Sequence, residues 1–359
     1  MRLIDLHCNW ALQYAGETCQ YDAAAYADVR TRLDQVEGYL TGTGIAVLTC
    51  GRRAGDWAQQ PDAWKTLGEM IARYEAEFSG RLLIGPDDVT RWNAEPPDGI
   101  GWGILGIEGF DALVRAPDDL DRLLGLFRRG VRVFQLVETE ASALGGAAVP
   151  GDDRGLTELG RAFLDRLDGL SRACGPSGPC PVVDLADLNS RATAEVLAWF
   201  ESDRTRLHRL LLVRSHGTIE TPHRAVVTGL SAENLQRFRA LGGVVGLSPG
   251  LPFFDSPEEF RDGIESIAAV PFRGLAGYMG IGIGTDFLNL EQSLPHLANV
   301  SRLTEWLAAN FPPDVAASVI RANAWKHLIR AAGEVPSYLE GVPDRPIDPC
   351  SLKAHAVPR

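Results

Sequence analysis

The chain begins with Met1-Arg2-Leu3-Ile4-Asp5-Leu6-His7-Cys8-Asn9, a short apolar run that ends in polar side chains. Side chains alternate along a strand, so His7 and Asn9 are expected on one face and Cys8 on the other. A histidine two positions before an oxygen donor is a common way to supply two ligands to one metal ion. Alone the pattern is weak, because a core histidine with a hydrogen-bond partner produces the same sequence.

Apolar, strand-like runs recur along the chain, and most are followed by a segment with helical periodicity. Continuous apolar strands indicate a parallel sheet covered on both faces. Eight such strands predict a single α/β domain, a closed (β/α)8 barrel of the TIM type, with a doubly wound sheet as the second choice. The expected strands are Arg2–His7, Gly44–Cys50, Gly101–Ile107, Val131–Val137, Pro181–Leu185, Leu210–Val213, Gly243–Leu247 and Met279–Gly284.

Two helices are expected to close the fold, Leu297–Asn310 and Pro313–Ala332, and the barrel domain is expected to cover residues 1–333. Residues 334–359 are rich in proline, which predicts a tail that is not helical. The Gly-rich stretch Ala143–Gly155 is expected to form a loop over the barrel mouth, a usual place for substrate contacts.

The net charge of -12 argues against nucleic acid or an anionic membrane as the main partner, because both are bound by basic patches. No apolar run approaches the roughly 20 residues needed to span a bilayer, and no signal-peptide pattern is present. A cytoplasmic location is therefore expected. The six cysteines show no regular spacing, so most are expected to be reduced, and a disulfide between Cys174 and Cys180 is not expected.

Polar side chains end several of the later strands. Glu108 follows Ile107, and a carboxylate in that position is costly unless it is paired or bound to a metal. The alternative for Glu108 is an ion pair with a nearby arginine such as Arg132. His216 and Asp286 end two further strands. Because the carboxyl ends of barrel strands meet at one mouth, these side chains are expected to converge there.

Taken together, the motifs resemble the membrane dipeptidase (renal dipeptidase) family of metallopeptidases, within the amidohydrolase group of barrels. The resemblance runs from Asp5 to about Leu328. The matching stretches are Asp5-Leu6-His7, Ile107-Glu108-Gly109, Gly130-Val131-Arg132, Gly155-Leu156-Thr157-Glu158-Leu159-Gly160-Arg161, Val183-Asp184-Leu185, Ser215-His216, Leu230-Ser231-Ala232-Glu233-Asn234-Leu235, Gly242-Gly243-Val244-Val245-Gly246, Gly282-Ile283-Gly284-Thr285-Asp286-Phe287 and Asn323.

The resemblance implies a metallo-dependent hydrolase with two zinc ions bridged by a glutamate, acting on dipeptides. It implies His7 as a ligand of the first metal, Glu108 as the bridge and His216 as a ligand of the second. It implies Asp286 as the catalytic residue that handles the proton of the hydrolytic water. The family is often dimeric, which implies a homodimer here.

Four positions depart from the family pattern. Asn9 stands where the family has an aspartate, and Asp187 stands where it has the histidine of an Asp-Leu-Ser-His motif. Glu138 falls where the family has a histidine that contacts the tetrahedral intermediate, and it is the second candidate catalytic residue. The family's substrate-binding arginine is missing, and Arg224 is the nearest substitute. Altered metal, catalytic and substrate positions together predict that the substrate is not an ordinary dipeptide.

These departures move negative charge from one metal site to the other, since an asparagine offers only a neutral oxygen. We therefore expect one divalent ion held tightly by Glu108, Asp187 and His216, and a second held weakly by His7 and Asn9. Zinc is the expected metal, with Mn²⁺ or Mg²⁺ as alternatives. Two functions stay open: a divergent hydrolase of a small dipeptide-like substrate, and a catalytically degenerate pseudoenzyme that binds or scaffolds.

Overall fold

The structure is a computed structural model that describes residues 1–14, 33–51, 62–94, 101–110, 113–138, 142–175, 178–220, 229–251, 253–290 and 292–333. Within these residues, eight parallel strands form a closed barrel in the order β1-β11-β9-β6-β5-β4-β3-β2. The (β/α)8 barrel is thus confirmed, and the doubly wound sheet is wrong. The barrel strands are β1 (Leu3–Cys8), β2 (Thr43–Cys50), β3 (Trp102–Ile107), β4 (Val131–Gln135), β5 (Val182–Asp184), β6 (Leu211–Arg214), β9 (Val244–Leu247) and β11 (Ile281–Ile283).

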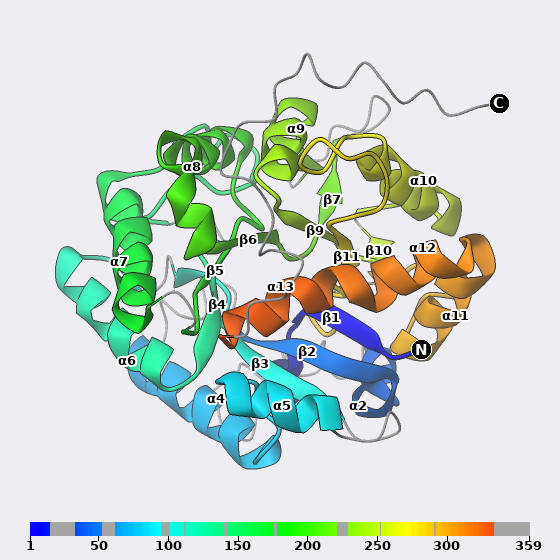
Figure 1. Ribbon diagram of the computed structural model, residues 1–359, viewed down its shortest axis with the longest axis horizontal. Coiled ribbons are helices and arrows are strands. Elements are labelled where there is room, and N and C mark those ends of the chain that lie inside the picture. The colour runs from blue at the N-terminus through cyan, green and yellow to red at the C-terminus, as the bar shows by residue number, and fades with distance from the viewer. Residues whose placement is uncertain are drawn as a thin grey trace.

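Helices surround the barrel, as Figure 1 shows. Several begin at a polar cap: the side chains of Thr157, Asn189 and Ser231 each accept a hydrogen bond from a backbone N–H of the first helical turn. The helices of this layer are α2 (Tyr39–Gly42), α4 (Ala63–Glu77), α5 (Pro86–Ala94), α6 (Arg122–Arg128), α7 (Glu158–Cys174), α8 (Ser190–Ser202), α9 (Ala232–Ala240), α10 (Pro257–Ala268) and α11 (Val300–Asn310), with the 3₁₀ turns η1 (Trp10–Tyr14), η2 (Leu33–Val36), η4 (Pro117–Asp121) and η5 (Arg204–His208).

Two short strand pairs lie outside the barrel. One pair is parallel and the other antiparallel, and each strand has two residues. They are β7 (Thr218–Ile219) with β8 (Gly229–Leu230), and β10 (Gly250–Leu251) with β12 (Gln292–Ser293).

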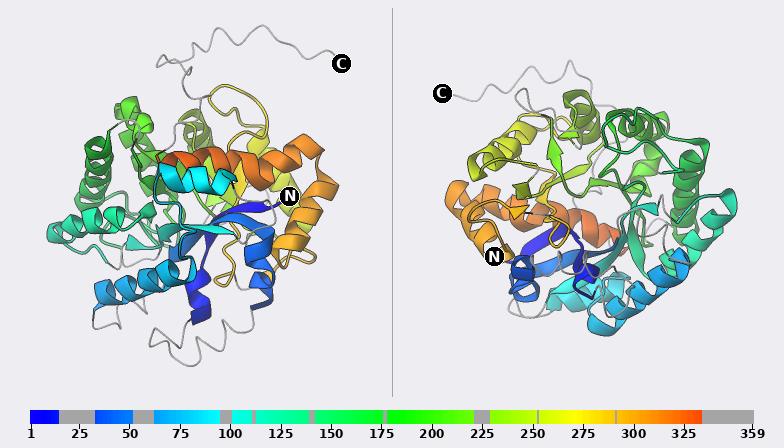
Figure 2. Two further views of the ribbon diagram at one scale, coloured as in Figure 1. Left: turned by 60° about the horizontal axis from the view of Figure 1, so that its bottom comes forward. Right: turned by 180° about the vertical axis from the view of Figure 1, so that it is seen from behind.

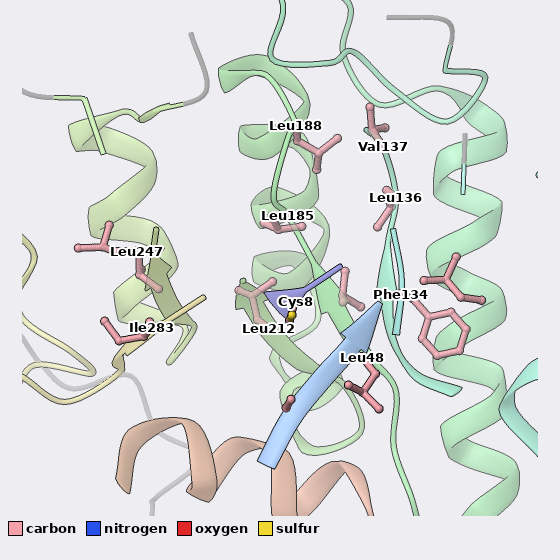
Figure 3. Packing of buried hydrophobic residues seen from close by; sticks show 14 of the residues in the cluster. Cys8, Leu48, Phe134, Leu136, Val137, Leu185, Leu188, Leu212, Leu247 and Ile283 are labelled. Atoms are coloured by element: carbon pink, nitrogen blue, oxygen red, sulfur yellow. The ribbon is translucent and has the colours of Figure 1, made fainter. Parts of the chain in front are cut away.

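The apolar core has an inner and an outer layer, because successive side chains of each strand point to opposite faces. The inner layer fills the barrel with branched residues such as Ile45, Val47 and Val133. The outer layer joins the strands to the surrounding helices, and Figure 3 shows part of it, including Leu48 and Phe134.

The last helical segment closes the N-terminal end of the barrel. It consists of α12 (Pro313–Ala317), a π-turn η6 (Ser318–Ala322) and α13 (Asn323–Ala331), so the single expected helix Pro313–Ala332 contains an irregular turn. Figures 1 and 2 show α13 lying across this end, in front of the strands in one view and behind them in the other. Its Leu328 packs with inner-layer residues such as Ile4 and Leu6. Helix α13 does not cover the opposite, C-terminal end.

Three further expectations concern the ends and the loop. Residues 334–359, the expected tail, lie outside the described residues, so the domain boundary stays a prediction. The loop 143–155 lies at the C-terminal end of β5, since Ala148 N–H donates to Asp187 O at 2.6 Å and Asn189 N–H donates to Gly146 O at 3.1 Å. Among the described residues, every helix is too short or too polar to cross a membrane.

Candidate metal centre

Four polar side chains converge at the C-terminal end of the barrel. His7, Glu108, His216 and Asp286 each offer a ligand atom, and these atoms all lie within 4.8 Å of one another. The four residues come from the ends of β1, β3, β6 and β11, which meet at this mouth. All four are buried, with exposed fractions between 0 and 4%. The structure thus brings together residues separated by almost the whole chain.

A bulge in β1 aims His7 into this cluster. Ile4 and Leu6 point into the barrel, so strict alternation would turn His7 outward. Asp5 pairs with Ala46 and Cys8 with Leu48, which places three steps of β1 opposite two of β2. The extra residue resets the alternation, as bulges often do beside functional sites. Cys8 consequently points into the outer apolar layer (Figure 3), as expected for a residue that is not a ligand.

The polar side chains of the cluster lie in contact with one another. His7 Nε2 lies 3.4 Å from Glu108 Oε1 and 3.8 Å from Asp286 Oδ1. The rings of His7 and His216 have centroids 4.0 Å apart. Glu108 Oε1 is fully buried and accepts no hydrogen bond. A buried carboxylate oxygen without a donor is costly, so this atom is a good position for a bound cation.

Ser215 orients both imidazoles from behind. Its Oγ lies 2.9 Å from Nδ1 of His216 and 3.3 Å from Nδ1 of His7. A hydroxyl oxygen has two lone pairs, so it can accept from the Nδ1–H groups of both rings when both coordinate through Nε2. The contacts leave Nε2 of each ring facing the cluster, the arrangement by which metal-binding histidines are usually fixed. Sequence reasoning missed this role, although Ser215 adjoins a matched motif residue.

Asn9 lies in the cluster on the same side as His7, as alternation predicts beyond the bulge. Its Nδ2 donates to Asp286 Oδ1 at 3.0 Å, while Thr49 Oγ1 lies 3.2 Å from Asn9 Oδ1. Thr49 has one proton and is also 2.9 Å from Cys8 O. When the Thr49 hydroxyl donates to Cys8 O, the side-chain amide of Asn9 can be rotated by half a turn, which exchanges its nitrogen and oxygen. The Asn9 nitrogen would then donate to Thr49 Oγ1, and the Asn9 oxygen would face the cluster. The ligand role of Asn9 stays a prediction.

Asp187 contacts the cluster from the rim. Its Oδ2 lies 3.3 Å from His216 Nε2, and about a fifth of the side chain (21%) is exposed. Gln135 Nε2 donates to the same oxygen at 2.8 Å. The backbone of Asp187 is left-handed, with φ 60°, as is that of Asp286, with φ 53°. Such backbones are uncommon outside glycine and concentrate at functional sites.

Burial and crowding of charge shift the pKa values of the cluster. Burial raises the pKa of Glu108 to about 7 and that of Asp286 to about 6. Burial and the neighbouring His216 lower the pKa of His7 to about 3. For His216 burial acts in the same downward direction, but the carboxylates of Asp187, Asp286 and Glu108 outweigh it and raise the pKa to about 10. Without a cation the cluster therefore holds protons in its place.

The donor set fits a divalent ion. Two imidazoles and up to three carboxylates suit zinc, and the oxygen-rich rim also suits Mn²⁺ or Mg²⁺. The imidazole of His7 is neutral and so is ready to coordinate. The unpartnered Glu108 Oε1 and the raised pKa values are both what an excess of buried negative charge without its counter-ion produces.

Two buried aspartates clamp the strand ends that carry the cluster. Asp5 Oδ1 accepts from Thr285 N–H at 2.9 Å, and Asp184 Oδ1 accepts from Ser215 N–H at 2.9 Å. Each carboxylate also accepts from the N–H two residues further along its own chain, that of His7 or Ala186. These clamps fix the residues immediately before Asp286 and His216. Sequence reasoning missed both roles, although Asp5 and Asp184 belong to matched motifs.

The remaining site expectations have different outcomes. The proposed ion pair between Glu108 and Arg132 is wrong, because Arg132 donates to the carbonyl oxygens of Phe127 and Ile84 near the start of β4. Glu138 lies three residues beyond the end of β4 and is half-buried, and its catalytic role stays a prediction. Arg224 lies outside the described residues. Cys174 and Cys180 are free thiols.

Comparison with known proteins finds similar barrels among solved structures only. A scan against protein-family models finds no match, and neither does a search of curated proteins. Among solved structures, a metallo peptidase from Rhodobacter sphaeroides liganded with a phosphinate mimic of L-Ala-D-Ala gives a TM-score of 0.65 at 18% identity, covering 92% of this chain and 99% of that one. The probable dipeptidase PvdM from Pseudomonas aeruginosa gives 0.65 at 16% identity, covering 93% and 95%.

An amidohydrolase from Pseudomonas aeruginosa gives a TM-score of 0.63 at 17% identity, covering 92% of this chain and 96% of that one. These likenesses confirm that the chain has the barrel fold shared by dipeptidase-type metallopeptidases and amidohydrolases. At such low identity they establish the fold alone, and they leave the chemistry to be argued from this chain's own residues.

Proposed function

We propose that the protein is a divergent metal-dependent hydrolase that cleaves a dipeptide-like amide or a related bond in a small substrate. The observation that carries the proposal is the convergence of His7, Glu108, His216 and Asp286 within 4.8 Å at the C-terminal end of the barrel. Buried groups of this kind are retained at a cost to stability, which a purely structural barrel has no reason to accept.

The metal would be held by His7, Glu108 and His216, with Asp187 adding a carboxylate at the rim. A divalent ion in this position supplies a Lewis acid and makes water easier to deprotonate. Because Asp187 is an anion and Asn9 is neutral, we expect one tightly held ion on the side of Asp187 and His216. Zinc is the metal we propose, with Mn²⁺ or Mg²⁺ as alternatives.

Asp286 would accept the proton of the attacking water and return it to the leaving amine. Asn9 Nδ2 holds Asp286 Oδ1 at 3.0 Å, and Asp286 N–H donates to His7 O at 3.0 Å, so the carboxyl group is fixed in the mouth. Burial raises its pKa to about 6, closer to neutral pH than that of an ordinary carboxyl group. A base with a pKa near the working pH is the most effective one.

Substrate recognition rests on weaker observations. Glu138 follows β4 at the mouth and has acidic chemistry, so we propose that it interacts with the amine of the substrate. We propose that Arg224 binds an anionic group of the substrate, in place of the substrate-binding arginine of the family that the chain resembles. A cytoplasmic location and a homodimer complete the proposal and stay predictions.

A pseudoenzyme is the second candidate, and one observation favours it. The ion pair between Asp187 Oδ2 and His216 Nε2 at 3.3 Å satisfies both groups without a metal. If ion pairs among the cluster residues replace the metal, the barrel can remain folded and act as a binding or scaffolding protein.

The test combines metal analysis with kinetics on the full chain purified without chelators. A panel of dipeptides, including some with a D-residue at the C-terminal side, serves as substrate. We expect bound metal and measurable hydrolysis, with Asp286→Asn lowering kcat/KM by roughly 10²–10⁴-fold. Asp262→Asn, at an exposed carboxylate on α10, is the matched control and should leave the rate unchanged. A metal-free wild type without activity would support the pseudoenzyme instead.

A further inference from the structure

A second recess lies at the opposite end of the barrel from the metal centre. It is bounded by α13 and by the N-terminal ends of β6 and β9, and contains about 620 Å³ of empty space, part of it open to solvent. Figure 1 shows α13 crossing this end of the strands. Its floor is apolar and includes the buried side chains of Leu210, Leu241 and Val244. We call it the basal recess.

One wall of the basal recess is cationic. Lys326, His327 and Arg330 line it together with Asn323, a spacing that puts all four on one face of α13. Arg273, from the segment after α10, adds a second guanidinium. The described residues that line the recess include no carboxylate. In a chain with a net charge of -12 this gathering of positive charge is a local feature.

Local contacts hold the side chains of this wall in position. His327 Nε2 lies 3.1 Å from Leu212 O, so this nitrogen carries the proton and donates it to the carbonyl. Arg330 donates to the carbonyl oxygen of His208 at the rim. Gly242 has a positive φ of 84°, and a Cβ there would overlap the guanidinium of Arg273, so glycine lets this side chain lie against the backbone.

The charges of Arg273 and Arg330 reach the neutral imidazole of His327, so these three side chains lie close together. Burial lowers the pKa of His327 to about 3, and the charges of Arg273 and Arg330 lower it further in the same direction. A group of cations around a low-dielectric floor raises the local potential for an anion. The same environment excludes a cationic ligand and gives a neutral one no electrostatic gain.

We propose that the basal recess binds a small amphipathic anion, with its charged head between Lys326, Arg273 and Arg330 and its hydrocarbon body on the leucine floor. The head is a carboxylate or a phosphate monoester, since both present oxygens that guanidinium and ammonium groups bind. The body is a short chain or a single ring that lies on the apolar floor. This site is separate from the metal centre and does not depend on the proposed hydrolase activity.

Titration calorimetry on the full chain at low salt tests the proposal with ligands of equal chain length. The probes are octanoate, octyl phosphate, octanol and octylamine. We expect at least one of the two anions to bind with one site per chain and to weaken as salt is added. We expect octanol and octylamine to bind at least about tenfold more weakly. The tighter anion identifies the head group. Equal binding of octanol, or no binding of either anion at millimolar concentration, overturns the proposal.

Variants locate the binding site. Lys326→Glu places a carboxylate on the cationic wall at an exposed position and should weaken the anion about tenfold or more. Lys65→Glu, at an exposed lysine of α4, is the matched control and should leave binding unchanged. Lys326→Gln repeats the test with a milder change in case Lys326→Glu lowers stability. Binding that responds to Glu108→Gln and not to Lys326→Glu would place the anion at the metal centre and refute the assignment.

Discussion

Asp187 Oδ2 lies 3.3 Å from His216 Nε2, so a carboxylate at the rim pairs with the imidazole that follows β6. In the family that the chain resembles, a histidine stands at the position of Asp187. That ring and the ring equivalent to His216 would both face a metal as neutral ligands. Here the carboxylate keeps His216 protonated until a cation displaces the proton. Metal binding and proton release are therefore coupled at this pair.

Replacing Asp187 with asparagine should lower the pKa of His216 toward its ordinary value. The amide has the same shape and tolerates the left-handed backbone, but it removes the anion that stabilises the imidazolium. The measurement is an NMR pH titration of the His216 ring, with a chelator present to keep the protein free of metal. Asp153→Asn, at a carboxylate outside the cluster, is the control. An unchanged His216 pKa in Asp187→Asn would show that this pair does not set the protonation of the site.

The stability of the metal-free protein should fall as the pH rises from 7 to 9. The folded pKa of His216 is raised to about 10 from an ordinary value of 6.5, so its contribution is full below pH 6.5 and is lost as the pH approaches 10. His7 and His327, with pKa values lowered to about 3, have no further protons to exchange in this window. We expect a loss on the order of 2 kcal/mol, measured by urea unfolding in chelator. A flat or rising profile would contradict the assignment.

Tyr39→Phe should destabilise the protein by about 2 kcal/mol. The Tyr39 hydroxyl donates to Asp5 Oδ2 at 2.6 Å in a fully buried position, and its loss leaves that clamp with one donor fewer. The matched control is Tyr278→Phe, because the Tyr278 hydroxyl donates to the solvent-exposed Glu265 at 2.7 Å. That change should cost less than about 0.5 kcal/mol. Equal effects in urea unfolding would mean that the Asp5 clamp contributes nothing of its own.

Leu328→Ala should cost about 2–5 kcal/mol, since Leu328 is 1% exposed and closes the base of the barrel from α13. Leu275→Ala removes the same atoms from a side chain that is 58% exposed, and should cost less than about 0.5 kcal/mol. The two variants are compared by thermal and urea unfolding. A small effect of Leu328→Ala would show that α13 is not part of the cooperative barrel.

Much of the fold follows from local sequence pattern. Each expected strand is found to within two residues at either end, the largest differences being at the end of β4 and the start of β11. Continuous apolar runs bounded by glycine and polar residues are strong signals for buried parallel strands. The π-turn at Ser318–Ala322 has no such signal, because no proline or glycine interrupts that helix.

The residues of the site could be predicted from the polar side chains at the strand ends, but the geometry of the site could not. The four clustered residues could be expected to meet because parallel strands end at one mouth. The bulge that turns His7 inward depends on the pairing of β1 with β2, a contact between segments about 40 residues apart that local alternation does not encode. The roles of Gln135 and Ser215 likewise arise from contacts across strands.

The central claim is that His7, Glu108, His216 and Asp286 form a metal centre, and elemental analysis tests it most directly. The full chain is purified without chelators and compared with Glu108→Gln and with Glu265→Gln, a control at an exposed carboxylate. We predict about one divalent ion per chain in the wild type and in Glu265→Gln, and less than about a tenth of that in Glu108→Gln. A wild type without metal, even after dialysis against zinc and manganese, or a Glu108→Gln variant that holds as much metal as the wild type, would contradict the account.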